Sequence, residues 1–112
     1  MSNYQLISPI QIASGAVTTT DTLIFTSAAL TRTFIKDINI TNTNVAARTI
    51  NLHIVTATGT VGTANALMYG LSIAPNTVYR WTGTQIMNSG DRLYVKGSDT
   101  GLTIFVSGAE AV

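Results

Sequence analysis

The sequence predicts an all-β protein: a single antiparallel β-sandwich, jelly-roll-like or immunoglobulin-like, formed by residues 1–112 as one domain. Three observations lead to this prediction. Apolar and polar side chains alternate along several segments, which is the pattern of a strand with one buried face. Turn-forming residues separate these segments by roughly 8–12 residues, the spacing typical of sandwiches and barrels. No window keeps the spacing of an amphipathic helix for more than about two turns.

The clearest predicted strand covers residues 49–55. Ile50, Leu52 and Ile54 would face the core, whereas His53 would face the other way, beside Asn51. Further segments are rich in the β-branched and aromatic residues that suit strands. These predicted strands comprise residues 4–12, 22–26, 78–82, 91–96 and 102–107, together with the segment around Ile38 and Ile40.

Two segments depart from this pattern. Residues 64–67 predict at most one short helical turn, within the long connection from Val55 to Gly70. Pro9 lies inside the first predicted strand and cannot donate a ladder hydrogen bond, so residues 1–12 are predicted to form an edge strand or an extended arm. Such an arm would contact a neighbouring subunit, and its candidate contact residues are Tyr4, Leu6 and Ile7.

The composition is poor in charge. Charged residues make up 10% of the chain, against about 25% in an ordinary soluble domain. Thr supplies 19 positions, and Asn and Ser supply 8 each. Mean hydropathy is +0.32 and net charge is +1, which argues against disorder. We expect the Thr-rich strand faces to become covered on assembly, and the isolated monomer to be poorly soluble or self-associating.

The charge pattern also bears on partners and location. The six basic residues are scattered, which argues against binding to nucleic acid or to an anionic membrane. There is no apolar run long enough for a membrane span, and the N-terminus does not have the pattern of a secretory signal. We therefore expect a soluble protein made inside a cell. Without cysteine, the chain has no disulfide and no thiol nucleophile.

The sequence contains little that indicates catalysis. His53 has no metal-ligating residue at a suitable spacing, so it is predicted to be a surface or subunit-contact histidine. Asp21, Asp91 and Asp99 lie in predicted turns, where aspartate bonds to local backbone. Asp37 is predicted to pair across strands with an arginine. No nucleophile or phosphate-binding motif is present. We expect no enzymatic activity, no cofactor and no metal.

Three aromatic residues allow two interpretations. Tyr79 and Trp81 share one face of their strand and, with Tyr94, would form a stacking platform for a sugar or a base. In the favoured interpretation, Trp81 instead anchors the core or a subunit contact. Tyr79 and Trp81 therefore join the candidate partner-contact residues.

Several segments together resemble small virion proteins of tailed bacteriophages. They are TLIFT (22–26), INITNT (38–43), ARTINLHIV (47–55), ANAL (64–67), Trp81, SGD (89–91) and VSG (106–108). The likeness lies in the order of strands and turns over residues 22–108, and the first 20 residues fall outside it. The resemblance implies a β-sandwich subunit of a virus particle without enzymatic activity.

From the resemblance and the composition together, we expect a capsid decoration or cement subunit located in the virion and made in the host cytoplasm. It would form a homo-oligomer such as a trimer, and it would contact other virion proteins such as the major capsid protein. Two alternatives remain open at this point: an adaptor subunit of the neck, tail or fibre, and a carbohydrate-binding β-sandwich module.

Overall fold

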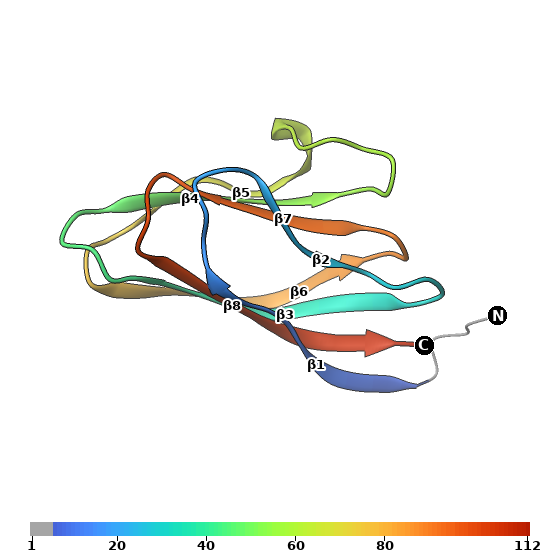
Figure 1. The fold of residues 1–112 in the computed structure, drawn as a ribbon. Coiled ribbons are helices and arrows are strands. Elements are labelled where there is room, and N and C mark those ends of the chain that lie inside the picture. Colours follow the sequence, from blue (N-terminus) through green and yellow to red (C-terminus); the bar gives the residue numbers. More distant parts are fainter. Residues whose placement is uncertain (1–5) are drawn as a thin grey trace.

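The computed structural model describes residues 6–112, which form a β-sandwich of two four-stranded antiparallel sheets (Figure 1). Sheet A contains, in spatial order, β1 (Ile7–Ala16), β8 (Leu102–Ala111), β3 (Arg32–Asn42) and β6 (Thr77–Met87). Sheet B contains β2 (Thr22–Thr26), β7 (Arg92–Gly97), β4 (Arg48–Val55) and β5 (Ala66–Ile73). The helical part of residues 6–112 is one 3₁₀ turn, η1 (Thr63–Asn65), so no described helix is long enough to cross a membrane.

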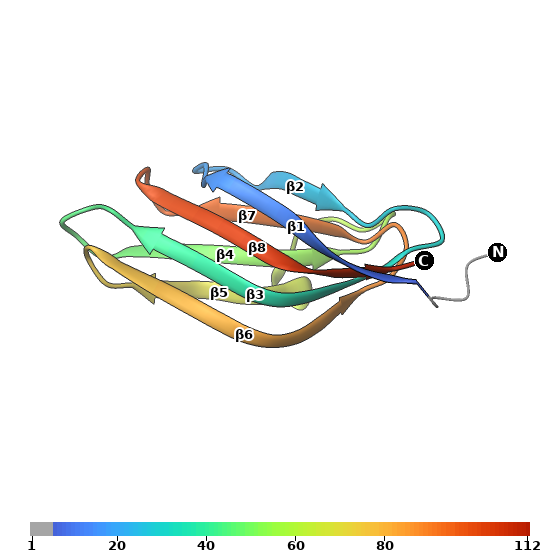
Figure 2. The ribbon, with the colours of Figure 1, turned by 90° about the horizontal axis from the view of Figure 1, so that it is seen from below.

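The strand order decides between the two topologies that the sequence allows. First pairs with last throughout: β1 with β8, β2 with β7, β3 with β6 and β4 with β5, all antiparallel. The chain thus follows the path of one long hairpin that is wrapped into two sheets, and Figure 2 shows sheet A in front of sheet B. Eight strands arranged in this way form a jelly roll.

The core lies between the sheets and is built from the alternating residues that the sequence indicates. Ile38 and Ile40 of β3 are fully buried, as are Ile50 and Leu52 of β4 on the facing sheet. Burying each such side chain contributes about 1.5–3 kcal/mol. The rest of the buried cluster is Ile12, Val17, Ile35, Met68, Ile73, Met87, Leu93, Val95, Leu102, Ile104 and Val106.

β1 lies at the edge of sheet A, where it pairs only with β8. It begins at Ile7 and continues to Ala16, four residues beyond the predicted strand of residues 4–12. Pro9 is exposed on this strand. Leu6 is bound to the C-terminal residue by two backbone hydrogen bonds, in which the amides of Leu6 and Val112 donate to each other's carbonyls at 3.2 and 2.9 Å. Tyr4 lies outside the described residues.

β8 also extends beyond its predicted end, to Ala111, and in β5 and β6 local irregularities interrupt the alternation on which the prediction depends. β5 occupies the segment that the sequence indicates as a connection; Gly70 has a φ of +62° there, and the register with β4 shifts twice between Ile50 and His53. β6 extends to Met87 rather than ending near residue 82, since its register with β3 shifts between Thr82 and Gln85. Such bulges insert extra residues, so a strictly alternating pattern no longer marks the strand.

Candidate functional site

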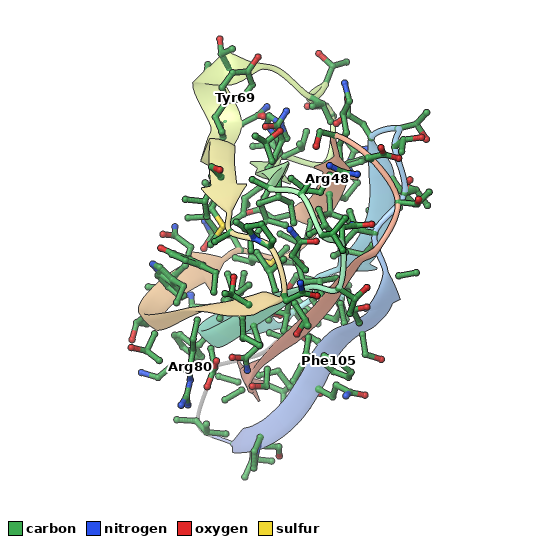
Figure 3. The ribbon with its side chains drawn as sticks, turned by 90° about the vertical axis from the view of Figure 1, so that its left-hand side faces the viewer. Arg48, Tyr69, Arg80 and Phe105 are labelled. Atoms are coloured by element: carbon green, nitrogen blue, oxygen red, sulfur yellow. The ribbon has the colours of Figure 1, made fainter. Side chains whose placement is uncertain are left out.

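Among residues 6–112, no segment covers the outer face of sheet A, which is wide and poor in charge. Its side chains form rows that run across all four strands, such as Ser14, Phe105, Asn39 and Arg80, or Ala16, Thr103, Thr41 and Val78. Phe105 remains 48% exposed although its strand lies inside the sheet. Figure 3 shows Phe105 and Arg80 on this side of the sandwich and Tyr69 on the opposite side. The face therefore combines hydroxyl and amide groups with exposed apolar side chains.

One ion pair stands out on this face, and it confirms the predicted cross-strand partner of Asp37. Arg80 Nη2 lies 2.6 Å from Asp37 Oδ2, and Arg80 Nε donates to the same oxygen at 3.1 Å. The hydrogen bond to Asp37, followed by charge attraction, raises the pKa of Arg80. Both charges are thus matched within the face itself.

The aromatic residues singled out in the sequence do not meet on one surface. Tyr79 and Trp81 lie opposite the buried residues Ile40 and Ile38, and both are half-buried against the core cluster. Tyr94 belongs to the other sheet, where its hydroxyl accepts a hydrogen bond from Arg92 Nη1 at 3.0 Å. The structure thus forms no exposed platform from these three residues. Leu6 and Ile7 are exposed, at 69% and 65%.

Part of the outer face of sheet B lies under the β4–β5 connection, residues 56–65. Arg92 holds this connection, since its Nη2 donates to the carbonyls of Thr56 and Gly59 at 2.9 and 2.6 Å. Asn65 holds it from the other end. Its Nδ2 donates to the Thr60 carbonyl at 2.8 Å, and its Oδ1 accepts from the Gly62 amide at 3.2 Å.

This cover corrects the prediction of a surface position for His53. The side chain faces away from the core, as the alternation indicates, yet it is only 2% exposed. Its Nδ1 lies 3.0 Å from Asn65 Oδ1, and its ring meets that of Tyr69 edge-on, with centroids 6.3 Å apart. The β4–β5 connection and Tyr69 bury His53 on the outside of the sheet, which period-two alternation cannot reveal. Within residues 6–112, no group of three or more potential ligands could hold a metal ion.

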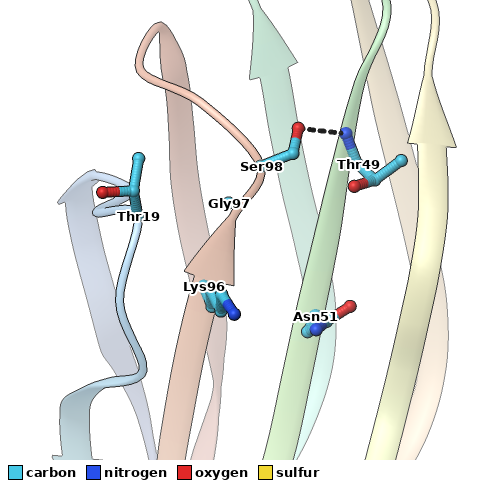
Figure 4. A pocket seen from close by; sticks show the side chains of 6 residues that line it. All are labelled: Thr19, Thr49, Asn51, Lys96, Gly97 and Ser98. Atoms are coloured by element: carbon cyan, nitrogen blue, oxygen red, sulfur yellow. Dashed lines mark hydrogen bonds between the residues drawn. The ribbon is translucent and has the colours of Figure 1, made fainter.

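Beside this cover, the outer face of sheet B is hollowed. The first hollow has a volume of about 310 Å³ and is lined by Thr19, Thr49, Asn51, Lys96, Gly97 and Ser98 (Figure 4). The second has a volume of about 200 Å³ and is lined by Asp21, Asn51, His53, Val61, Gly62, Thr63, Tyr69 and Lys96. Because Asn51 and Lys96 line both, we treat the two hollows as one feature, the sheet-B groove.

Backbone hydrogen bonds hold two of the polar side chains in the sheet-B groove. Ser98 Oγ accepts from the Thr49 amide at 2.9 Å, and Asn51 Oδ1 accepts from the Gly70 amide at 2.8 Å. Each side chain keeps its own donors available, namely the Ser98 hydroxyl hydrogen and the Asn51 Nδ2. The sequence does not reveal this groove, because Tyr69 and Gly70 lie in a segment predicted to be a connection.

The turn aspartates have different roles. Asp91 and Asp99 bond to local backbone as predicted, accepting from the amides of Asn88 and Thr100 at 2.9 and 2.7 Å. Asp99 also lies 3.5 Å from Arg48 Nη2. Asp21 instead lines the sheet-B groove.

Comparison with known structures shows the same fold in proteins of very different sequence. A chain in the structure of the infectious bursal disease virus Gx strain is 11% identical with a TM-score of 0.58; the match covers 99% of this chain and 32% of that one. A chain of the VP2 subviral particle of that virus is 12% identical with a TM-score of 0.55, covering 99% and 33%. This chain therefore spans about a third of the length of these viral chains.

A third similar structure is a chain of the Bacillus endospore appendages, which form disulfide-linked pili. It is 10% identical with a TM-score of 0.55, and the match covers 96% of this chain and 87% of that one. No family model matches the sequence, and no curated protein matches it. At these identities the likeness concerns the fold: viral capsid and pilus structures contain a similar β-sandwich.

Proposed function

We propose that this chain is a non-enzymatic structural subunit of a bacteriophage particle, a decoration or cement subunit that stabilises the head. The observation that carries the proposal is the jelly-roll strand order combined with a wide outer face on sheet A that is poor in charge and that no segment of residues 6–112 covers. Viral capsid domains commonly use this architecture. The similar chains in infectious bursal disease virus structures support a role in a virion.

The chemistry of sheet A suits a surface that another protein covers. A charge buried without a partner is costly, whereas neutral hydroxyl and amide groups can exchange water for hydrogen bonds across an interface. Asp37 and Arg80 pair with each other, so neither charge would be buried without a partner in such an interface. Exposed apolar side chains such as Phe105 and Val78 add the hydrophobic area on which association depends. The subunit would form a homo-oligomer and contact the major capsid protein, within a virion assembled in the host cytoplasm.

A second candidate is an adaptor subunit of the neck, tail or fibre. The endospore appendage structure favours it, because that chain forms pili and 87% of its length is matched here. This sequence has no cysteine, so it cannot contribute the disulfides that link the appendage pili.

The copy number in the particle distinguishes these roles. Particles would be purified from the host that carries this sequence, disrupted, and analysed by mass spectrometry with isotope-labelled peptides of this chain and of the major capsid protein. Decoration predicts hundreds of copies for each particle, whereas an adaptor ring or fibre predicts a handful. Absence of the chain from purified particles would contradict both candidates.

A further inference from the structure

Lys96 differs from the other basic residues in its surroundings. Arg80 and Arg48 pair with aspartates, and Lys36 Nζ donates to Thr84 Oγ1 at 2.6 Å. Arg92 donates to backbone carbonyls, and Arg32 also has an interaction partner. Among residues 6–112, Lys96 alone of the basic side chains has no hydrogen bond or ion pair, and it stands over both hollows of the sheet-B groove.

The first hollow around Lys96 suits a single negative charge. None of its lining residues is acidic, and Thr49, Asn51 and Ser98 supply neutral hydrogen-bonding groups next to the ammonium. One ammonium with neutral donors matches a carboxylate, whereas a nucleic-acid backbone needs several cations. The backbone hydrogen bonds that hold Asn51 and Ser98 reduce the conformational entropy lost when a ligand binds.

The second hollow suits a sugar ring. Tyr69 is 63% exposed while its edge-on contact with His53 holds the ring in place, so one aromatic face is available for stacking. Asp21 and Asn51 line the same hollow and can bind hydroxyl groups. Tyr69 and Lys96 lie on β5 and β7, with β4 between them, so they are separated by about 10 Å. A disaccharide spans such a distance.

We propose that the sheet-B groove binds an acidic glycan, with a sugar carboxylate at Lys96 and a neighbouring ring against Tyr69. An acidic protein segment fits less well. Peptides usually add to a sheet edge or fill apolar pockets, whereas this groove lies on a sheet face and is lined mainly by hydroxyl, amide and charged groups. The proposal does not depend on the virion role, because the isolated protein contains the whole groove.

The test is a nuclear magnetic resonance titration of the ¹⁵N-labelled protein with four probes at millimolar concentration: digalacturonic acid, neutral galactobiose, sodium acetate and triglutamate. We expect saturable shifts from digalacturonic acid, confined to the amides near Thr49, Asn51, Tyr69 and Lys96. Galactobiose should bind at least several-fold more weakly. Triglutamate binding as tightly as digalacturonic acid would place an acidic protein segment in the groove and overturn the proposal, as would equal binding of acetate.

Variants separate the two halves of the site. Lys96→Gln should weaken binding of digalacturonic acid about tenfold, the usual size of a lost charged hydrogen bond, and leave galactobiose binding unchanged. Tyr69→Ala should weaken both sugars, and Tyr69→Phe, which keeps the ring, should restore binding. Lys36→Gln is the matched control on sheet A and should change nothing. The proposal fails if no sugar shifts these amides, or if Lys96→Gln and Lys36→Gln bind digalacturonic acid equally well.

Discussion

The outer face of sheet A is exposed and consists mainly of short neutral and apolar side chains. The outer face of sheet B is partly covered by residues 56–65 and partly hollowed by the sheet-B groove. Phe105 and Val78 are exposed on the first face. On the second, His53 is buried beneath residues 56–65, and Lys96 stands over the sheet-B groove. Along the strands of both sheets, buried and outward residues alternate, and the outward residues form the two faces. The segments that surround these outward residues differ between the sheets.

The difference shows that alternation assigns a side chain to a face but does not determine its exposure. On sheet B the connection from β4 to β5 is long enough to fold back over the strand that it leaves. Arg92 and Asn65 then fix it by hydrogen bonds to its backbone carbonyls. Sheet A has no such cover within the described residues, so outward side chains such as Phe105 and Val78 remain exposed.

The largest expected effect comes from removing the side chain at the centre of the covered part. His53→Ala deletes a buried ring together with its bond to Asn65, and it should lower the free energy of unfolding by about 2–4 kcal/mol. Urea unfolding followed by circular dichroism measures this loss. Thr49→Ala is the matched control, since Thr49 is an exposed outward residue of the same strand. Equal losses in the two variants would mean that residues 56–65 do not pack on the sheet.

A charge placed on each face tests which one self-associates. Phe105→Lys changes an outward residue of sheet A that is 48% exposed, and Leu23→Lys changes one of sheet B that is 45% exposed. If sheet A is the association face, Phe105→Lys should weaken self-association by tenfold or more, because a buried unpaired charge is costly, whereas Leu23→Lys should have little effect. Sedimentation equilibrium measures both. A stronger effect of Leu23→Lys would move the interface to sheet B.

The fold was predictable where strands are regular. Ile38 with Ile40, and Ile50 with Leu52, alternate with polar residues without interruption, and these residues lie in the core. β5 escaped prediction because Gly70 and two register shifts break its pattern. A strand that contains bulges leaves no simple period in the sequence.

The surfaces were predictable only where a single cross-strand contact defines them. Asp37 was expected to meet an arginine, and that arginine is Arg80. The burial of His53 and the shape of the sheet-B groove depend on how residues 56–65 fold back over the sheet. This is a tertiary contact, and no local sequence pattern indicates it. Low charge indicated a surface to be covered, but it did not indicate which of the two faces is open.

The smallest expected effect on stability concerns the ion pair on sheet A. Asp37→Asn removes the carboxylate that pairs with the exposed Arg80. The urea midpoint should fall far less than in His53→Ala, and the difference in midpoint between Asp37→Asn and the parent protein should shrink at high salt. Like any arginine, Arg80 is charged across the neutral and mildly alkaline range, and Asp37 raises its pKa further, so the contribution of the ion pair is present there and is lost only well above that range. The midpoint difference should accordingly stay constant across that range.

Association should respond to Asp37→Asn more strongly than stability, because an interface formed by sheet A would then bury Arg80 without its partner. Sedimentation equilibrium of Asp37→Asn beside the parent protein measures this, and an unchanged association constant would place Arg80 outside the interface.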